Sequence, residues 1–180
     1  MFDVNFRMTT KVDRVQKMVN DILKLTGKQV LVGVPDDRNT RKDGGPIGNA
    51  ALAYIHDKGS PLQGIPARPF MEPGINQAQD RINNQMLATA KSQLAGDVDG
   101  VDRHLNRAGM IAQSSIRRII NEGVGFEPIK RSTALARLRK RAGARKWSKD
   151  RREEVMESMH PLIDTGQLRN SITYVVADKR

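Results

Sequence analysis

PLIDTGQLRNSITYVV, at residues 161–176, combines a turn, a single helical turn and a strand in one short run. Thr165 can cap the helical turn by accepting the backbone amide of Gln167 or of the next residue. Gly166 lets the backbone bend beside this cap. Residues 172–176 are mostly β-branched or aromatic, which favours a strand. We expect such an ordered element to dock on another part of the protein.

Length and composition indicate one soluble domain over residues 1–180. A chain of 180 residues is long enough to bury a hydrophobic core without disulfides, and it contains no cysteine, which is typical of a reducing compartment. Apolar residues make up 38% of the chain, with no run near the roughly 20 residues of a membrane span. The first residues are not those of an export signal, so we expect a protein made and used without secretion and with no membrane partner.

Hydrophobic spacing predicts most of the regular elements. Helices are predicted over residues 10–26, 47–58, 76–94 and 102–121, and a strand over 29–34. The 76–94 helix gathers Ile82, Met86, Leu87, Ala90 and Leu94 on one face. The 102–121 helix turns Leu105, Ala108, Ala112, Ile116 and Ile119 inward, flanked by Ile111 and Ile120. Residues 36–46 contain no side chain that could pack, which predicts an exposed, mobile loop. The prolines and glycines of residues 59–75 predict a loop of defined shape, anchored by Ile65 and Phe70.

Basic residues are concentrated in one segment, residues 130–152. The chain has a net charge of +11, and this segment holds eleven cations and one acid, or +10, which leaves +1 for the rest. Such a segregated charge indicates a polyanion or an acidic partner. The predicted contacts are Arg137, Arg139, Lys140, Arg141, Arg145, Lys146 and Trp147. Trp147 could stack on a base or anchor the segment. A solvated charged face is the alternative.

The same segment predicts only a weakly docked helix over residues 132–142. Ser132 or Thr133 could cap it, and Leu135 and Leu138 are its only large apolar side chains. Charge repulsion disfavours a compact isolated fold, so we expect a partner to order residues 130–152.

No pattern indicates a metal, a cofactor or a catalytic centre. The histidines at 56, 104 and 160 are too far apart for a ligand motif, and the serines at 114, 115 and 171 are not in a nucleophile motif. Gly123 and Gly125 indicate the end of a helix, and the acidic residues around Gly100 indicate a turn between two helices. Asp164 is interpreted as part of a helix cap. We expect no enzymatic activity, with an enzyme such as a nuclease as a remaining alternative.

Two segments together resemble the neck, tail-completion or minor tail proteins that join heads to tails in long-tailed bacteriophages. The first is AYIHDKG, residues 53–59, running into IPARPFMEPGI, residues 65–75, and the second is PLIDTGQLRNSI, residues 161–172. The resemblance implies an α+β subunit with a small antiparallel sheet flanked by long amphipathic helices, and no enzymatic activity. It also implies a homo-oligomeric ring in the virion, assembled in the host cytoplasm, between the capsid connector or head-closure protein and the tail terminator or tail tube. Genome DNA could pass through its lumen.

The resemblance implies that one set of residues serves folding and assembly. These are Arg68, Pro69, Phe70, Asp164, Thr165, Gly166, Leu168, Arg169, Ser171 and Ile172. We hypothesise that Arg68, Phe70, Leu168 and Ile172 hold the sheet and the Pro-rich loop together. The 36–46 loop and the inserted 130–152 segment match no part of the family's motif. An alternative reading is a nucleic-acid-binding protein without sequence preference, acting through the basic segment.

Overall fold

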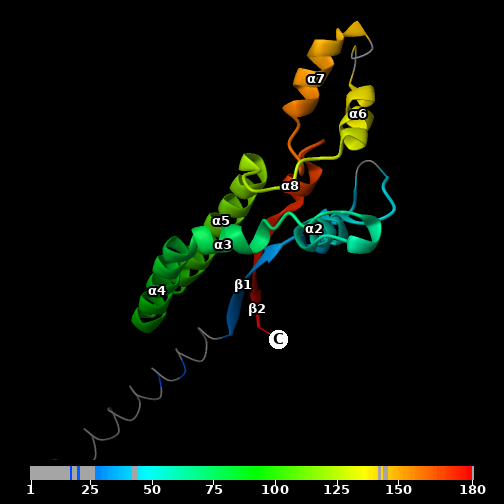
Figure 1. Cartoon of the computed structure of the whole chain (residues 1–180). Coiled ribbons are helices and arrows are strands. Elements are labelled where there is room, and N and C mark those ends of the chain that lie inside the picture. Colours follow the sequence, from blue (N-terminus) through cyan, green and yellow to red (C-terminus); the bar gives the residue numbers. More distant parts are fainter. Residues whose placement is uncertain are drawn as a thin grey trace, which may run out of the picture. The chain divides into compact units, whose positions relative to one another are not determined.

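The computed structural model describes residues 17, 20, 27–41, 44–141, 143 and 146–179, and these form an α+β fold (Figure 1). A two-stranded antiparallel sheet pairs β1 (Lys28–Gly33) with β2 (Thr173–Asp178). The helices are α2 (Asn49–Lys58), α3 (Met71–Gln77), α4 (Gln79–Ala95), α5 (Val98–Glu122), α6 (Arg131–Lys140), α7 (Lys149–Glu157) and α8 (Gln167–Ser171). The fold class implied by the resemblance is therefore confirmed, as are the predicted strands. The predicted helix at 10–26 lies almost wholly outside the described residues.

The chain divides into two compact units. The first comprises Met1–Val32, Ala78–Ala112 and Tyr174–Arg180, and the second comprises Gly33–Gln77 and Gln113–Thr173. Each unit therefore joins segments that are far apart in the sequence. Organisation as a single domain remains a prediction.

The first unit contains the sheet, α4 and the beginning of α5. Val101, Leu105 and Ala108 are at most 4% exposed, which confirms the inward face predicted for α5. A Cβ atom at Gly109 would lie 2.2 Å from Cδ2 of Tyr174, so only glycine lets the β2 ring approach α5 this closely. The amide of Gly100 donates to Asp97 Oδ1 over 2.9 Å, which confirms an interhelical turn between α4 and α5.

Helix α4 does not bury the apolar face that its sequence shows. Leu87 and Leu94 are 57% and 51% exposed, whereas Thr89 is only 1% exposed. The buried side carries polar groups: Gln85 Oε1 lies 3.0 Å from Nδ1 of His104 on α5. The packed side of α4 therefore includes Thr89 and Gln85, which the apolar pattern does not mark.

The second unit has its core around four apolar side chains that are completely buried. These are Phe70, Ile116, Ile120 and Ile172. Phe70 is thus an anchor of the Pro-rich loop, as predicted, and Ile120 is more deeply buried than Ile119, which was predicted to face inward. Helix α2 packs against α8, which brings the two segments of the resemblance together.

The loops of the second unit differ from two predictions. The Pro-rich loop ends at Phe70, because α3 begins at Met71 and accepts Pro73 in its first turn, where a proline removes no helical hydrogen bond. The prediction that residues 36–46 contain no side chain that could pack is wrong for residues 36–41, which the structure describes. Asn39 Oδ1 accepts the amide of Ala50 over 2.9 Å, and Asn49 Nδ2 donates to the Arg38 carbonyl over 2.9 Å.

Residues 130–152 form most of a helical hairpin, which corrects the prediction that a partner orders them. Helices α6 and α7 lie side by side (Figure 1) around the buried residues Ala134, Leu138, Val155 and Met156. Two of these apolar residues lie beyond residue 152, outside the segment on which the prediction was based. Helix α6 begins at Arg131, so Ser132 and Thr133 lie inside the helix and do not cap it. Arg131 binds Glu153 of α7 through two hydrogen bonds, which favours this earlier start.

Candidate functional site

The carboxylate of Asp57 joins α2 to the beginning of α3. Asp57 Oδ1 accepts the backbone amides of Phe70 over 2.9 Å and Met71 over 3.0 Å, and Lys58 Nζ lies 3.2 Å from Oδ2. Burial would raise the pKa of Asp57, but the amides of Met71 and Phe70 and the Lys58 ammonium together hold it below its ordinary value. Asp57 therefore caps α3 in its ionised form, from a different helix.

Arg68 joins the Pro-rich loop to the chain entering the hairpin. Its side chain is buried; Nε donates to the carbonyl of Glu127 over 2.8 Å, and Nη2 to that of Pro128 over 3.3 Å. Its backbone amide donates to the carbonyl of His56 over 2.8 Å. Burial lowers the pKa of Arg68, but a guanidinium remains charged. Pro69 next to it is exposed. Arg68 is therefore a structural cross-link, in agreement with the hypothesis that it holds the loop.

The second motif segment forms the short helix α8 and its cap. The amide of Gln167 donates to Thr165 Oγ1 over 3.4 Å, as predicted, but the N-cap residue of α8 is Gly166, with φ +74°, and not Thr165. Leu168 is buried, and Ser171 Oγ donates to its carbonyl over 2.7 Å. Because this bond ties the hydroxyl of Ser171 to its own helix, a structural role suits the serine better than a nucleophilic one.

Arg117 of α5 holds the end of α8, a role that sequence reasoning missed. Its Nε and Nη2 donate to the carbonyl of Ile172 over 3.1 and 2.6 Å, and Nη2 also donates to that of Asn170 over 3.2 Å. Arg169 donates to the side chain of Asn121 over 3.0 Å. The turn between α8 and β2 is therefore bound to α5 through two arginines.

Arg137 lies within the structure of the second unit, although it was predicted to contact DNA or an acidic partner. Its guanidinium donates to the carbonyls of His160, Pro161 and Ile163 over 2.8, 3.0 and 3.1 Å. Nε lies 3.9 Å from Oδ1 of Asp164, and the Arg137 side chain is only 15% exposed. Asp164 was predicted to help cap α8 and instead faces this arginine. Arg137 thus anchors the chain leaving the hairpin, as Arg68 anchors the chain entering it.

His56 borders a cavity of about 190 Å³ in the second unit. The cavity is also lined by Arg137, Leu162 and Leu168. Burial lowers the pKa of His56, and the positive charges of Arg68 and Arg137 lower it further. His56 is therefore neutral at physiological pH, and its buried Nδ1 has no hydrogen-bond partner in the described part of the chain.

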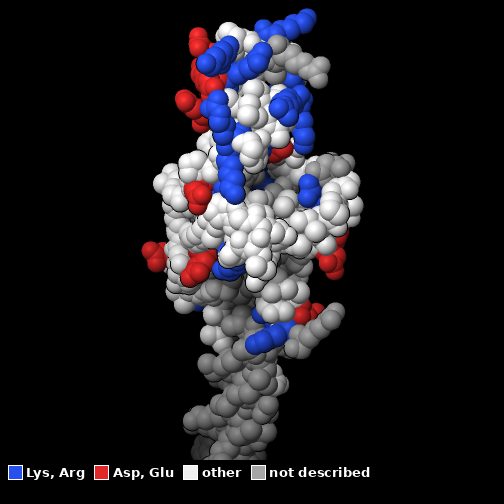
Figure 2. Space-filling model, turned by 45° about the vertical axis from the view of Figure 1, so that its right-hand side comes forward, with Lys and Arg blue, Asp and Glu red and all other residues white. Residues whose placement is uncertain are grey.

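The remaining predicted cations that the structure describes lie on the outside of the hairpin. Arg139, Lys140, Arg141 and Lys146 are exposed, whereas Arg145 lies outside the described residues. Figure 2 shows Lys and Arg side chains gathered over the α6–α7 hairpin, with acidic side chains along one edge of it. Residues 130–157 contain eleven cations and four acids, so the whole hairpin carries +7. The net charge of the hairpin is therefore lower than the +10 of residues 130–152 alone, but it is still strongly positive.

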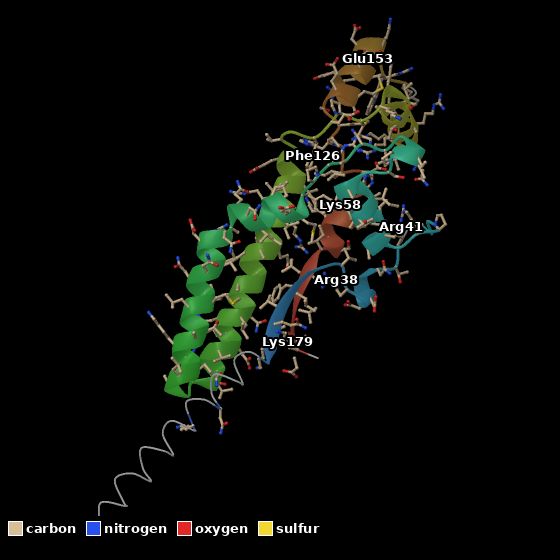
Figure 3. The ribbon with its side chains drawn as sticks, turned by 60° about the horizontal axis from the view of Figure 1, so that its bottom comes forward. Arg38, Arg41, Lys58, Phe126, Glu153 and Lys179 are labelled. Atoms are coloured by element: carbon tan, nitrogen blue, oxygen red, sulfur yellow. The ribbon has the colours of Figure 1, made fainter. Side chains whose placement is uncertain are left out.

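Ion pairs within the hairpin engage part of this charge. Glu153 on α7, labelled in Figure 3, binds Arg131, and Glu154 Oε2 accepts from Arg151 Nη1 over 3.0 Å. Trp147 is half-buried and packs against the apolar cluster of the hairpin. Of its two predicted roles, this contact favours anchoring the segment over stacking on a base.

Among the described residues, no group of three or more His, Cys, Asp or Glu side chains could hold a metal ion. No helix in the described part of the chain is long and apolar enough to cross a membrane. Comparison with protein-family models, with curated proteins and with solved structures finds no match to this chain.

Proposed function

We propose that this chain is a ring-forming neck or tail-completion subunit of a tailed bacteriophage, without enzymatic activity. It would join the capsid connector or head-closure protein to the tail terminator or tail tube. The observation that carries the proposal is the packing of α2 against α8, because these helices belong to the two motif segments. Segments about a hundred residues apart that resemble one family would be expected to meet in one structural unit, and these do.

The surface of the chain supports an assembled state. Tyr54 and Leu62, both in or beside the first motif segment, are 68% and 102% exposed. On the other unit, Leu87 and Leu94 are also more than half exposed. These side chains are available for contact with other subunits, and an interface would bury them.

The basic hairpin would face DNA in the lumen of the ring or an acidic neighbour. Its cations are carried by helices with their own apolar cluster, and Arg68 and Arg137 attach both of its ends. A charged element fixed in this way can meet a polyanion without first having to fold, which saves the entropy of ordering.

The proposal is tested by the mass of the purified protein and by the particles that form without it. Native mass spectrometry should reveal a closed homo-oligomer, and electron microscopy of a phage lacking the protein should show separate heads and tails. A complementing copy should restore joined particles. A strictly monomeric protein whose loss leaves heads and tails joined would overturn the proposal.

Sequence-independent nucleic-acid binding by the free protein is the second candidate, favoured by the exposure of Arg139, Lys140 and Arg141. Titration of labelled duplex DNA at several salt concentrations measures this activity. Replacing these three residues by alanine should weaken binding and flatten its salt dependence, because fewer counterions are released. The matched control replaces three exposed cations of the other unit, Arg81, Lys91 and Arg107. Tight binding by a monomer that plays no part in head-to-tail joining would favour this candidate over the ring.

A further inference from the structure

Three arginine side chains of the second unit meet at one residue, Asn170, near the end of α8. Arg38 Nη1 and Arg117 Nη2 donate to the backbone carbonyl of Asn170 over 3.5 and 3.2 Å. Arg169 Nε donates to the side-chain oxygen of the same residue over 3.2 Å. The three arginines come from the 3-10 turn η1 (Asp36–Arg38), from α5 and from α8. Because two guanidinium groups share one carbonyl oxygen, their positive charges are close together.

Little negative charge balances these arginines. The hydrogen bonds of Arg117 and Arg169 go to backbone carbonyl and side-chain amide oxygens, which carry no formal charge. In the described part of the chain, Asp37 is the only acid within 4.0 Å of the three guanidinium groups, and its side chain is 77% exposed. Burial lowers the pKa of Arg117, and the charges of Arg38 and Arg169 lower it further. The cluster therefore has an excess of positive charge.

A pocket of about 500 Å³ lies beside this cluster, and the residues that line it are all polar. Arg38 and Asn170 border the pocket, together with Asp37 and the hydroxyl-bearing residues Thr40 and Thr165. The side chain of Arg38 is 50% exposed, so its guanidinium group is accessible from solvent. A ligand in this pocket could accept hydrogen bonds from that guanidinium and from the threonine hydroxyls.

We propose that this pocket binds a phosphate group, which Arg38 contacts directly. A planar guanidinium matches the oxygens of a phosphate, and the hydroxyl groups supply donors for the oxygens that remain. Arg117 and Arg169 would favour the anion through their charges while they keep their structural hydrogen bonds. The phosphate could be a small ion or ester, or part of a DNA backbone. The inference goes beyond the proposed function, because it holds whether or not the chain is a neck subunit.

Thermal unfolding of the full chain in inorganic phosphate tests the site. At constant ionic strength, the rise of the midpoint with phosphate concentration gives a Kd, and phosphate should stabilise the protein more than chloride or acetate does. Arg38→Gln should raise this Kd about tenfold, because a charged donor is lost. Asp37→Asn should lower it about threefold, because a competing negative charge is removed. Arg81→Gln removes an equal charge from the other unit and should leave the Kd unchanged.

A purely structural role for Arg38 predicts a different pattern. Arg38→Gln would then lower the midpoint in the absence of phosphate, and Asp37→Asn would not change the Kd. Our inference predicts a nearly unchanged midpoint without phosphate, because Arg38→Gln loses one long hydrogen bond and relieves repulsion from Arg117. Equal stabilisation of the wild type and Arg38→Gln by phosphate would overturn the inference, and so would equal stabilisation by phosphate and acetate.

A short oligothymidylate distinguishes the two sources of phosphate. Its binding is measured in the variant that has alanine at Arg139, Lys140 and Arg141, so that the hairpin contributes less. A DNA backbone in the pocket predicts that adding Arg38→Gln weakens oligothymidylate binding further. If Arg38→Gln weakens the binding of inorganic phosphate but not that of the oligothymidylate, the site is one for a small phosphate ion or ester.

Discussion

The carboxylate of Asp57 accepts the backbone amide of Phe70 over 2.9 Å, so that α2 caps the first turn of α3 across thirteen residues of sequence. The bond is buried, and the charge on Asp57 also receives the amide of Met71. These two hydrogen bonds stabilise the path of the whole Pro-rich loop, because they fix where the loop ends.

Replacing Asp57 should therefore destabilise the second unit. Asp57→Ala leaves two amides without an acceptor, for which we expect a loss of about 3 kcal/mol in the free energy of unfolding, and Asp57→Asn should lose less because an acceptor oxygen remains. Urea titration measures both. The exposed Asp178→Asn change at the end of β2 is the control and should have little effect. Equal stabilities of Asp57→Ala and the wild type would show that the cap contributes nothing.

Arg137 and Arg139 should respond differently to the same conservative change. Arg137→Lys replaces a guanidinium that donates to three carbonyls, and should cost about 2 kcal/mol of stability because an ammonium cannot reproduce that geometry. Arg139 is exposed, so Arg139→Lys should stay within about 0.5 kcal/mol of the wild type. Both changes keep the net charge. Similar unfolding curves for the two variants would contradict a structural role for Arg137.

Gly74→Ala should destabilise the chain although alanine is the better helix former. A Cβ at Gly74 would lie 2.7 Å from the Cα of Ile116, a backbone atom of α5 that cannot move aside alone. Such overpacking costs about 1–3 kcal/mol, against about 1 kcal/mol gained in helix propensity. Thermal unfolding should show a lower midpoint. Gly33→Ala, where a Cβ would meet nothing within 4 Å, serves as the comparison.

Protonation of His56 should weaken the fold as the pH falls. Its folded-state pKa lies below the ordinary value of 6.5, so below that pH the unfolded chain binds a proton that the folded chain does not. Stability from this group is therefore present above about pH 6.5 and is lost as the pH falls from there towards the folded pKa. Unfolding free energies measured over this range should decline less in His56→Gln than in the wild type. An equal slope would remove His56 as the cause.

The sequence predicted the elements well where local patterns and packing agree. The predicted strands, α2 and the inward face of α5 all appear, because their spacing of apolar residues matches the surfaces that they bury. Helix α4 shows the limit. Its leucines mark a helix correctly, but Thr89 is buried and Gln85 contacts His104 of α5, and such polar contacts leave no periodic hydrophobic signal.

The candidate site was predictable as two motifs and a basic segment, but its internal roles were not. Arg137 and Arg139 are two residues apart on one helix and look equivalent in sequence, yet one binds carbonyls and the other faces solvent. Val155 and Met156 follow the charged part of the segment and complete an apolar cluster with Ala134 and Leu138. The sequence indicates this apolar cluster only when the segment considered is extended beyond residue 152 to include the apolar residues of α7.

All the hydrogen bonds that tie Arg68 and Arg137 to the base of the hairpin go to main-chain oxygen atoms, and Asp164 adds an ion pair to Arg137. Arg68 binds the carbonyls of Glu127 and Pro128 where the hairpin begins, and Arg137 binds those of His160 and Pro161 where it ends. Only Arg137 lies within the hairpin; Arg68 and both carbonyl sets belong to its flanks. A hairpin of other length or charge could therefore be exchanged at this point, provided that it keeps one arginine in the place of Arg137. The rest of the subunit could thus keep its structure while the segment inserted at this position differs and suits a different partner.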